Sequence, residues 1–350
     1  MKRRQFVAGA GVAGAALGAA PAVKAQTATT LTIESTYAPG SGRAQTGRDF
    51  AERVAMLSGG DITVQIVEAG AQGAELMDRL SGNEVDGVLG SQDDWYSFSP
   101  AFSLFAAVPG GMMERELEAW IRSDTGQERW DALAAEYGMK PLYLGDAGGE
   151  MLWSSVALTD PSALDGLSVA ARGMSAATWR AAGANAPSSA DPAPFPTGVE
   201  AYETAPLAEQ YAARENAPAR LYLDTPTRPT SAVSLSLSLP RWEGLTDAQR
   251  RVLDYAADAV TFRTNARSMQ ANALAHQAVR LGGTTVEKLP EPVWTALMDA
   301  ARETYEALGE QEGEARRAWR AYFRFARDVQ NWTRLSEAAF TVARARNVPA

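Results

Sequence analysis

Residues 31–91 alternate between strand patterns and helix patterns, and this alternation restricts the fold more than any other feature of the chain. Strand-like segments cover 31–36, 61–70 and 84–91. Segments with apolar residues at helical spacing lie between them, over 46–60 and 73–82. This strand–helix–strand–helix–strand order predicts an α/β protein in which a parallel sheet carries helices on its faces.

A second α/β run comes next, and a long helical stretch follows it. Residues 246–283 open with a capping box formed by Thr246 and Gln249, and the helical pattern ends at Gly282. One uninterrupted helix of this length would be about 50 Å long. Residues 291–345 are predicted to form two or three further helices. The pattern favours two α/β lobes around a cleft, an arrangement that suits ligand capture by hinge closure.

The expected lobes are each built from two stretches of the chain. Lobe I is expected to comprise residues 26–147 and about 233–282, so that it includes the long helix. Lobe II is expected to comprise about 148–232 and 283–350, with the C-terminal helices.

The first 25 residues have the pattern of a targeting segment. A basic start is followed by a mildly apolar stretch and by small residues up to Ala25, where a signal peptidase would cut before Gln26. Arg3 and Arg4 are adjacent, which favours the twin-arginine route of export to the periplasm. The alternative is an ordinary secretory signal that contains two arginines.

The charge balance and the residue counts exclude several classes of function. Without the leader, 29 basic and 42 acidic residues remain, which argues against nucleic acid and anionic membranes as partners. No apolar run long enough to span a membrane exists, so the mature chain is expected not to cross one. The chain has no cysteine and only one histidine, His276, which excludes thiol catalysis and multi-histidine metal centres. No catalytic motif is recognised, and we expect a protein that is not an enzyme.

Polar and aromatic residues follow the third predicted strand. Asp93, Asp94, Trp95 and Tyr96 stand at its carboxyl end, where α/β sheets bind ligands. The alternative is a surface loop with partly packed aromatic side chains. Arg172 ends a further predicted strand in a stretch of small neutral residues, and it is either the fixed charge of a binding site or a solvated strand end.

Four stretches of the chain resemble one known family. They are 50–70 (FAERVAMLSGGDITVQIVEAG), 99–112 (SPAFSLFAAVPGGM), 126–151 (GQERWDALAAEYGMKPLYLGDAGGEM) and 321–340 (AYFRFARDVQNWTRLSEAAF). Together they are similar to the periplasmic solute-binding subunits of tripartite ATP-independent periplasmic (TRAP) transporters, in the branch linked to 2-oxo acids and related carboxylates. The resemblance implies the two-lobed periplasmic binding protein fold, with a long bridging helix and a helical C-terminal segment.

The resemblance also implies an arginine that clamps the ligand carboxylate, but the expected position has changed. Ala170 stands where that arginine is expected, and Arg172 falls two places later, which keeps it on the same face of a strand. Ser155 replaces a second basic residue, while Trp153 is kept. These departures predict an atypical binding site.

Further positions of the site follow from the same resemblance. Glu150 replaces a glutamine, Glu203 is retained from a Glu-Trp pair, and Arg228 stands where an acid is common. From the residues alone, Glu203 and Glu200 follow a turn one helical turn apart, as at a solvated helix start. For Arg228 the alternative to a ligand contact is a solvated position. The expected ligand-binding residues are Asp94, Trp95, Tyr96, Glu150, Trp153, Arg172, Glu203, Tyr222 and Arg228.

The resemblance finally implies partners. We expect a small organic acid as ligand, delivery to the TRAP membrane subunits, and a homodimer as a further option. No cofactor is expected, except that Glu150 and Glu203 leave room for a bound cation. The alternatives are a ligand-poor scaffold or sensor with this fold, and an exported enzyme of unrecognised type.

Overall fold

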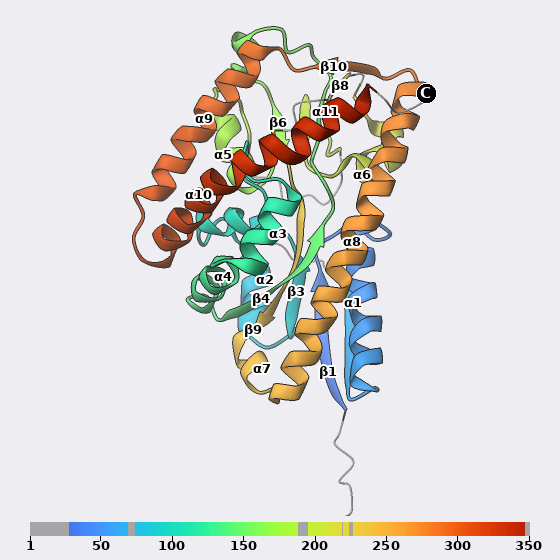
Figure 1. The fold of residues 1–350 in the computed structure, drawn as a ribbon, viewed down its shortest axis with the longest axis vertical. Helices are drawn as coiled ribbons and strands as arrows, with labels where there is room; N and C mark the ends of the chain where they lie inside the picture. Colours follow the sequence, from blue (N-terminus) through green and yellow to red (C-terminus); the bar gives the residue numbers. More distant parts are fainter. Residues whose placement is uncertain (1–27, 69–73, 188–194, 219, 224–226, 347–350) are drawn as a thin grey trace, which may run out of the picture.

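The computed structural model describes residues 28–68, 74–187, 195–218, 220–223 and 227–346. In this part the chain forms two five-stranded sheets, one in each of two lobes (Figure 1). The sheet of lobe I has the strand order β2-β1-β3-β9-β4, and that of lobe II has the order β10-β8-β5-β7-β6. The expected leader, residues 1–25, lies outside the described residues.

Lobe I contains the alternating segment that opens the sequence. Its strands are β1 (Thr29–Ser35), β2 (Ile62–Glu68), β3 (Gly87–Gly90), β4 (Met139–Asp146) and β9 (Ala232–Ser238). Its helices are α1 (Gly42–Ser58), α2 (Ala74–Ser81), α3 (Glu114–Ser123), α4 (Gly126–Ala135) and α7 (Leu239–Glu243). β1 pairs in parallel with both β2 and β3, which confirms the predicted parallel arrangement, and β9 runs antiparallel to β3 and β4.

Lobe II has shorter strands. They are β5 (Leu152–Ser154), β6 (Val169–Ala171), β7 (Ala201–Glu203), β8 (Arg220–Leu223) and β10 (Thr285–Lys288), with helices α5 (Gly173–Ala181), α6 (Leu207–Ala212) and α9 (Glu291–Gly309). The alternative of a solvated helix start for Glu200 and Glu203 is wrong, because β7 is a strand paired with β5 and β6. The exposed Glu200 precedes it, whereas Glu203 is buried at its end.

The long helix α8 (Asp247–Leu281) joins the two lobes. The Thr246 and Gln249 capping box is present at its start, as predicted. Near this end Leu253 packs in the core of lobe I, and near the other end Val279 packs in a core of lobe II. In Figure 1 the helix runs from lobe I in the lower part of the view to lobe II in the upper part.

The C-terminal helices are α10 (Gly313–Thr333) and α11 (Ala339–Ala345), joined by a π-helical turn at Arg334–Ala338. Ala318 and Tyr322 of α10 belong to the core of lobe I, and the Tyr322 hydroxyl accepts a hydrogen bond from Met112 N at 2.9 Å. The expected assignment of all residues after 283 to lobe II therefore fails for α10. In the described residues no helix is both long and apolar enough to cross a membrane.

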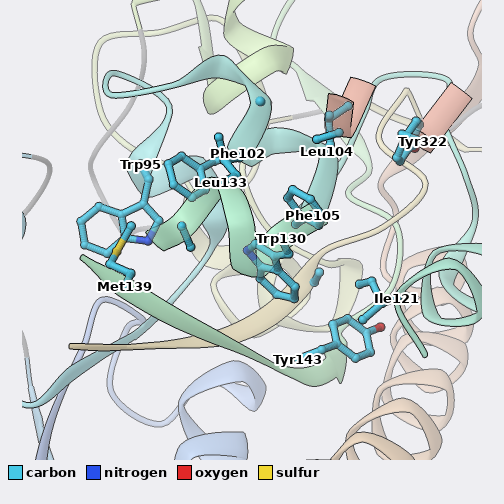
Figure 2. Close-up of a cluster of buried hydrophobic side chains, with 14 of the residues drawn as sticks. Trp95, Phe102, Leu104, Phe105, Ile121, Trp130, Leu133, Met139, Tyr143 and Tyr322 are labelled. Atoms are coloured by element: carbon cyan, nitrogen blue, oxygen red, sulfur yellow. The ribbon is translucent and has the colours of Figure 1, made fainter. Parts of the chain in front are cut away.

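Stacked aromatic rings fill the core of lobe I (Figure 2). Phe105 stacks on Trp120 with ring centroids 5.1 Å apart and on Trp130 with centroids 5.0 Å apart. The Trp130 indole donates a hydrogen bond to Gln92 Oε1 at 3.0 Å. This contact anchors the turn that follows β3 to the core of lobe I. The next two residues of the turn, Asp93 and Asp94, pair with Arg228 and Arg172.

Candidate ligand-binding site between the lobes

Two chain segments cross from one lobe to the other side by side. Glu150 N donates to Arg228 O at 3.0 Å, and Ala147 N donates to Ser231 O at 3.0 Å. These backbone bonds place Glu150 and Arg228 at the junction of the two lobes. The Arg228 side chain is buried, with 2% of its surface exposed, so the alternative of a solvated position for this residue is wrong.

Arg228 is surrounded by carboxylates. Its Nη2 donates to Asp93 Oδ2 at 2.5 Å, and its Nη1 lies 3.4 Å from Glu150 Oε2. Glu203 is close enough for its charge to act on Arg228 as well. We call Asp93, Glu150, Glu203 and Arg228 the inner cluster. Because a buried charge is costly unless it is paired, the acids and the arginine hold one another in place.

Glu203 has two hydrogen-bond donors but a costly environment for a negative charge. Its Oε2 accepts hydrogen bonds from Ser175 Oγ and, at 3.1 Å, from Trp179 Nε1. Burial raises the pKa of Glu203 to about 7, although these hydrogen bonds and the charge of Arg228 oppose the rise. The carboxyl group is therefore protonated in a large fraction of molecules near neutral pH.

A second group of charges lies next to the inner cluster and connects the lobes. Arg43 of α1 pairs with Glu209 of α6 at 2.8 Å, and Arg172 Nη1 lies 3.6 Å from Asp94 Oδ1. Each pair joins a residue of lobe I to a residue of lobe II. We call Tyr37 and these four residues the outer cluster.

Arg172 lies at the start of α5, directly after β6. The residue is only 6% exposed, so the alternative of a solvated strand end is wrong. Its partner Asp94 also accepts a hydrogen bond from Thr36 Oγ1 at 2.9 Å. Burial raises the pKa of Asp94, and the charge of Arg172 opposes this rise.

Tyr37 has an unsatisfied hydroxyl group in the middle of the outer cluster. The residue is 4% exposed, and the Arg43 guanidinium lies 4.8 Å from the centre of its ring. Among the described residues, nothing forms a hydrogen bond with its hydroxyl. The charges of Arg43, Asp94, Arg172 and Glu209 all act on this group. A buried hydroxyl without a partner is unfavourable, so this position favours a bound molecule with an acceptor atom.

A cavity of about 500 Å³ adjoins the Arg43–Glu209 pair. The loop of residues 38–42, the helix α6 and the helix α8 line it. The cavity therefore lies between the lobes and reaches the outer cluster at Glu209.

Sequence reasoning missed three residues of these clusters, namely Tyr37, Arg43 and Glu209, and it placed Asp93 at a ligand-binding strand end without including it among the expected ligand-binding residues. Tyr37 follows the predicted strand 31–36 as Asp94 follows the third strand, and β1 and β3 are parallel neighbours. The rule that located Asp94, that ligands bind at the carboxyl ends of parallel strands, also locates Tyr37.

Two of the expected tryptophans lie away from both clusters. Trp95 belongs to the core of lobe I (Figure 2). Its indole donates to Ser236 Oγ at 3.2 Å. Trp153 belongs to a core of lobe II, where its indole donates to Gln210 Oε1 at 3.0 Å. Both indoles are fully buried with their N–H groups satisfied, so neither is available to contact a ligand.

The two expected tyrosines also lie elsewhere. Tyr222 packs in the core of lobe II, and its hydroxyl accepts a hydrogen bond from Leu158 N at 2.8 Å. Tyr96 is half-buried and lines a separate cavity of about 330 Å³ together with Met174 and Glu303. Of the nine expected residues, the structure brings together Asp94, Glu150, Arg172, Glu203 and Arg228.

The positions at which the resemblance implies arginines do not serve this site. Ala170 is buried in a core of lobe II, and Ser155 is exposed, with its hydroxyl donating to Glu200 O at 3.1 Å. The basic side chains at the junction come instead from Arg43, Arg172 and Arg228.

The inner cluster does not fit a metal ion as it stands. Glu150 is hydrogen-bonded by Ser231 at 2.9 Å and paired with Arg228, and Glu203 is hydrogen-bonded by Ser175 and Trp179. In the described part of the chain, no three acidic, histidine or cysteine side chains are arranged to hold a metal ion. A guanidinium stands among the acids that would have to supply the oxygen ligands.

No protein-family model and no curated protein sequence matches the chain. Solved structures do match it. A TRAP periplasmic solute-binding protein from Colwellia psychrerythraea, with bound calcium and pyruvate, superimposes with a TM-score of 0.83 at 18% identity, over 90% of this chain and 99% of that chain. One from Bordetella bronchiseptica RB50, a dimer with copurified calcium and picolinate, gives 0.82 at 18% identity, over 91% and 99%.

A third, from Pseudoalteromonas atlantica T6c with bound sodium and pyruvate, gives 0.81 at 17% identity, over 90% of this chain and 98% of that chain. These matches cover nearly the whole of each neighbour. The chain therefore has the two-lobed fold of TRAP periplasmic solute-binding proteins, as the resemblance implies.

Proposed function

We propose that this chain is the solute-binding subunit of a TRAP transporter, which captures a small carboxylate between its lobes and delivers it to the membrane subunits. Two observations support the proposal. The fold is that of proteins solved with bound pyruvate or picolinate, both of which are small carboxylates. The junction of the lobes carries buried arginines beside the unsatisfied hydroxyl of Tyr37.

The Tyr37 hydroxyl carries the proposal. Burial raises the pKa of this group, so it stays protonated and can donate to a carboxylate oxygen. Arg172 lies in the same cluster, and its planar guanidinium matches the geometry of a carboxylate. A ligand anion placed here would satisfy Tyr37 and would be stabilised by a fixed positive charge.

The charge balance of the site predicts how an anion is accommodated. The outer cluster contains two arginines and two acids, so a bound carboxylate adds one uncompensated negative charge. Asp94 in this cluster and Glu203 in the inner cluster both have raised pKa values. Uptake of a proton by either acid would offset the added charge, so we expect protonation to accompany binding.

A thermal-shift screen tests the proposed ligand class. Pyruvate and picolinate are added to the purified protein, with pyruvamide and picolinamide as controls that have similar shape but no charge. We expect one or more small carboxylates to raise the melting temperature by several degrees, since binding to the native state alone stabilises it. No shift with any acid of a broad panel, or an equal shift with the amides, contradicts the proposal.

The same screen distinguishes the proposed function from the alternative functions. A ligand-poor scaffold or sensor predicts no shift with any small acid. We propose that the chain is not an enzyme, because it has the fold of binding proteins and its sequence carries no recognised catalytic motif. Turnover of an acid that binds would overturn this part of the proposal.

We further propose that the chain is exported to the periplasm and begins at Gln26 after cleavage. The support is the basic start with Arg3 and Arg4 and the small residues before Ala25. Replacing both arginines by lysine is expected to block export by the twin-arginine route. Unchanged export of that variant would contradict the route but not the periplasmic location.

The C-terminal helices support a homodimer as part of the proposal. Trp332, Leu335, Phe340 and Val342 are exposed on this segment, although such side chains are normally buried. One solved structure with this fold is described as a dimer. Light scattering coupled to gel filtration should give twice the monomer mass for the wild type and the monomer mass for Trp332→Ser/Phe340→Ser. A monomeric wild type contradicts the dimer.

A further inference from the structure

Three neighbours in fold were solved with calcium or sodium together with a carboxylate, whereas this chain holds a guanidinium among its buried acids. Arg228 Nη2 is 2.5 Å from Asp93 Oδ2, and Arg228 Nη1 is 3.4 Å from Glu150 Oε2. These two acids come from opposite lobes, and Glu203 adds a third carboxyl group within range of Arg228. The positive charge that pairs with acids of both lobes is therefore the Arg228 side chain.

We propose that Arg228 takes the place of a bound metal ion, so that ligand binding and lobe closure in this protein require no calcium or sodium. This inference deepens the proposed function and rests on it for the ligand, but it makes a separate statement about metal. A guanidinium and a divalent cation cannot occupy the space among the same carboxylates, because their charges repel and each of the three acids already has at least one oxygen engaged in a hydrogen bond.

Three features of the contacts support a built-in cation. Arg228 is fixed by its backbone, because its carbonyl accepts a hydrogen bond from Glu150 N at 3.0 Å. Its Asp93 partner is fixed as well, since Ser103 Oγ donates to Asp93 Oδ1 at 2.5 Å. Glu150 Oε1 accepts from Ser231 Oγ at 2.9 Å, which leaves Oε2 turned to the guanidinium. Metal coordination would have to break these contacts.

The geometry also predicts what happens when the guanidinium is removed. Arg228→Met keeps much of the side-chain volume but leaves Asp93 and Glu150 buried without a cation. Carboxylate oxygens are ligands that Ca²⁺ prefers. We expect this variant to be less stable than the wild type and to recover stability when Ca²⁺ is added.

The experiment uses Ca²⁺ as the probe and measures protein stability and bound metal. Wild type, Arg228→Met and Arg79→Met are treated with a chelator, and their melting temperatures are recorded with CaCl₂ and with a choline chloride control of equal ionic strength. Arg79→Met is the matched control, because Arg79 pairs with the buried Glu34 at 2.7 Å outside the clusters. Bound metal is counted by mass spectrometry.

We expect no bound metal and no Ca²⁺-specific shift in the wild type or in Arg79→Met, and a rise of at least about 3 °C in Arg228→Met. The double variant Arg228→Met/Glu150→Gln should lose this rise. Stoichiometric Ca²⁺ in the wild type overturns the inference, even if Arg228→Met does not fold. A folded Arg228→Met that does not respond to Ca²⁺ also counts against it.

The ligand screen keeps this inference apart from the proposed function. An acid that binds equally well with chelator and with Ca²⁺ supports both. An acid that binds only with Ca²⁺ supports the proposed function and overturns the built-in cation. If no acid binds in either condition, the proposed function fails, and the metal counts still decide the role of Arg228.

Discussion

Replacing Glu203 by glutamine should change how the stability of this protein depends on pH. Burial raises the pKa of the Glu203 carboxyl from its ordinary value of 4.5 to about 7. Between these two pH values the folded state keeps a proton that the unfolded state has released. The free energy of unfolding must therefore fall as the pH rises through this window. Above about pH 7 both states are ionised, and the contribution of this group stops changing.

The size of the effect follows from the shift. A rise from 4.5 to about 7 corresponds to about 3 kcal/mol of stability lost between pH 4.5 and 7, at about 1.4 kcal/mol for each pH unit. Glu203→Gln keeps the shape and the acceptor oxygen that Ser175 and Trp179 bond, but it cannot ionise. The variant should lose this part of the pH dependence. Asp146, whose pKa burial also raises to about 7, leaves a remaining slope of the same sign.

Urea denaturation at pH 5, 6, 7 and 8 provides the assay. The difference in unfolding free energy between Glu203→Gln and the wild type should grow in favour of the variant from pH 5 to 7 and level off above it. Glu52→Gln is the control, because Glu52 is exposed on α1. Parallel pH profiles for Glu203→Gln and the wild type would refute the argument from burial.

Three other predictions concern the outer cluster. Tyr37→Phe removes one donor to the ligand and should weaken binding of the acid roughly 3- to 30-fold, by calorimetry, with little loss of stability; unchanged affinity contradicts a ligand contact. Arg43→Met and Glu209→Gln break an ion pair that joins the lobes, so small-angle scattering should show larger dimensions in the absence of ligand. Dimensions identical to the wild type would show that this pair does not hold the lobes together. Binding at pH 7 should be accompanied by net proton uptake through Asp94 or Glu203, of up to about one proton. This uptake is measured as a buffer-dependent calorimetric enthalpy, and an enthalpy independent of the buffer contradicts it.

The local patterns of the sequence predicted those elements that are long enough to show a period. The helix expected over 246–283 is present as α8, and the alternation of 31–91 gives the parallel strands β1, β2 and β3. β7 was missed because three residues cannot show a period, and its pairing with β5 and β6 decides its conformation. The docking of α10 on lobe I depends on contacts such as Tyr322 with Met112, which are 210 residues apart.

The charged half of the expected site was predictable and the aromatic half was not. Glu150, Arg172, Glu203 and Arg228 meet at the junction, whereas Trp95, Trp153 and Tyr222 point into the cores of their lobes. The burial of a large ring in a core contributes a few kcal/mol, so an aromatic residue beside a strand end packs inward unless something prevents it.

Arg43 and Glu209 could not be paired from the sequence. They are 166 residues apart and meet only because the two lobes approach each other. No local pattern contains that information. The same holds for Asp93, whose partner Arg228 lies 135 residues away.

Calorimetric titration of Arg172 variants tests the central claim, that the interlobe arginines bind a small carboxylate, most directly. The acid found in the thermal-shift screen is titrated into the wild type, Arg172→Ala, Arg172→Lys and Arg180→Ala. The last is the control, because Arg180 is an exposed arginine on the same helix α5. A lost charge-assisted contact should weaken binding at least about tenfold in Arg172→Ala, with partial recovery in Arg172→Lys and no change in Arg180→Ala. Affinity of Arg172→Ala within about threefold of the wild type would contradict the claim.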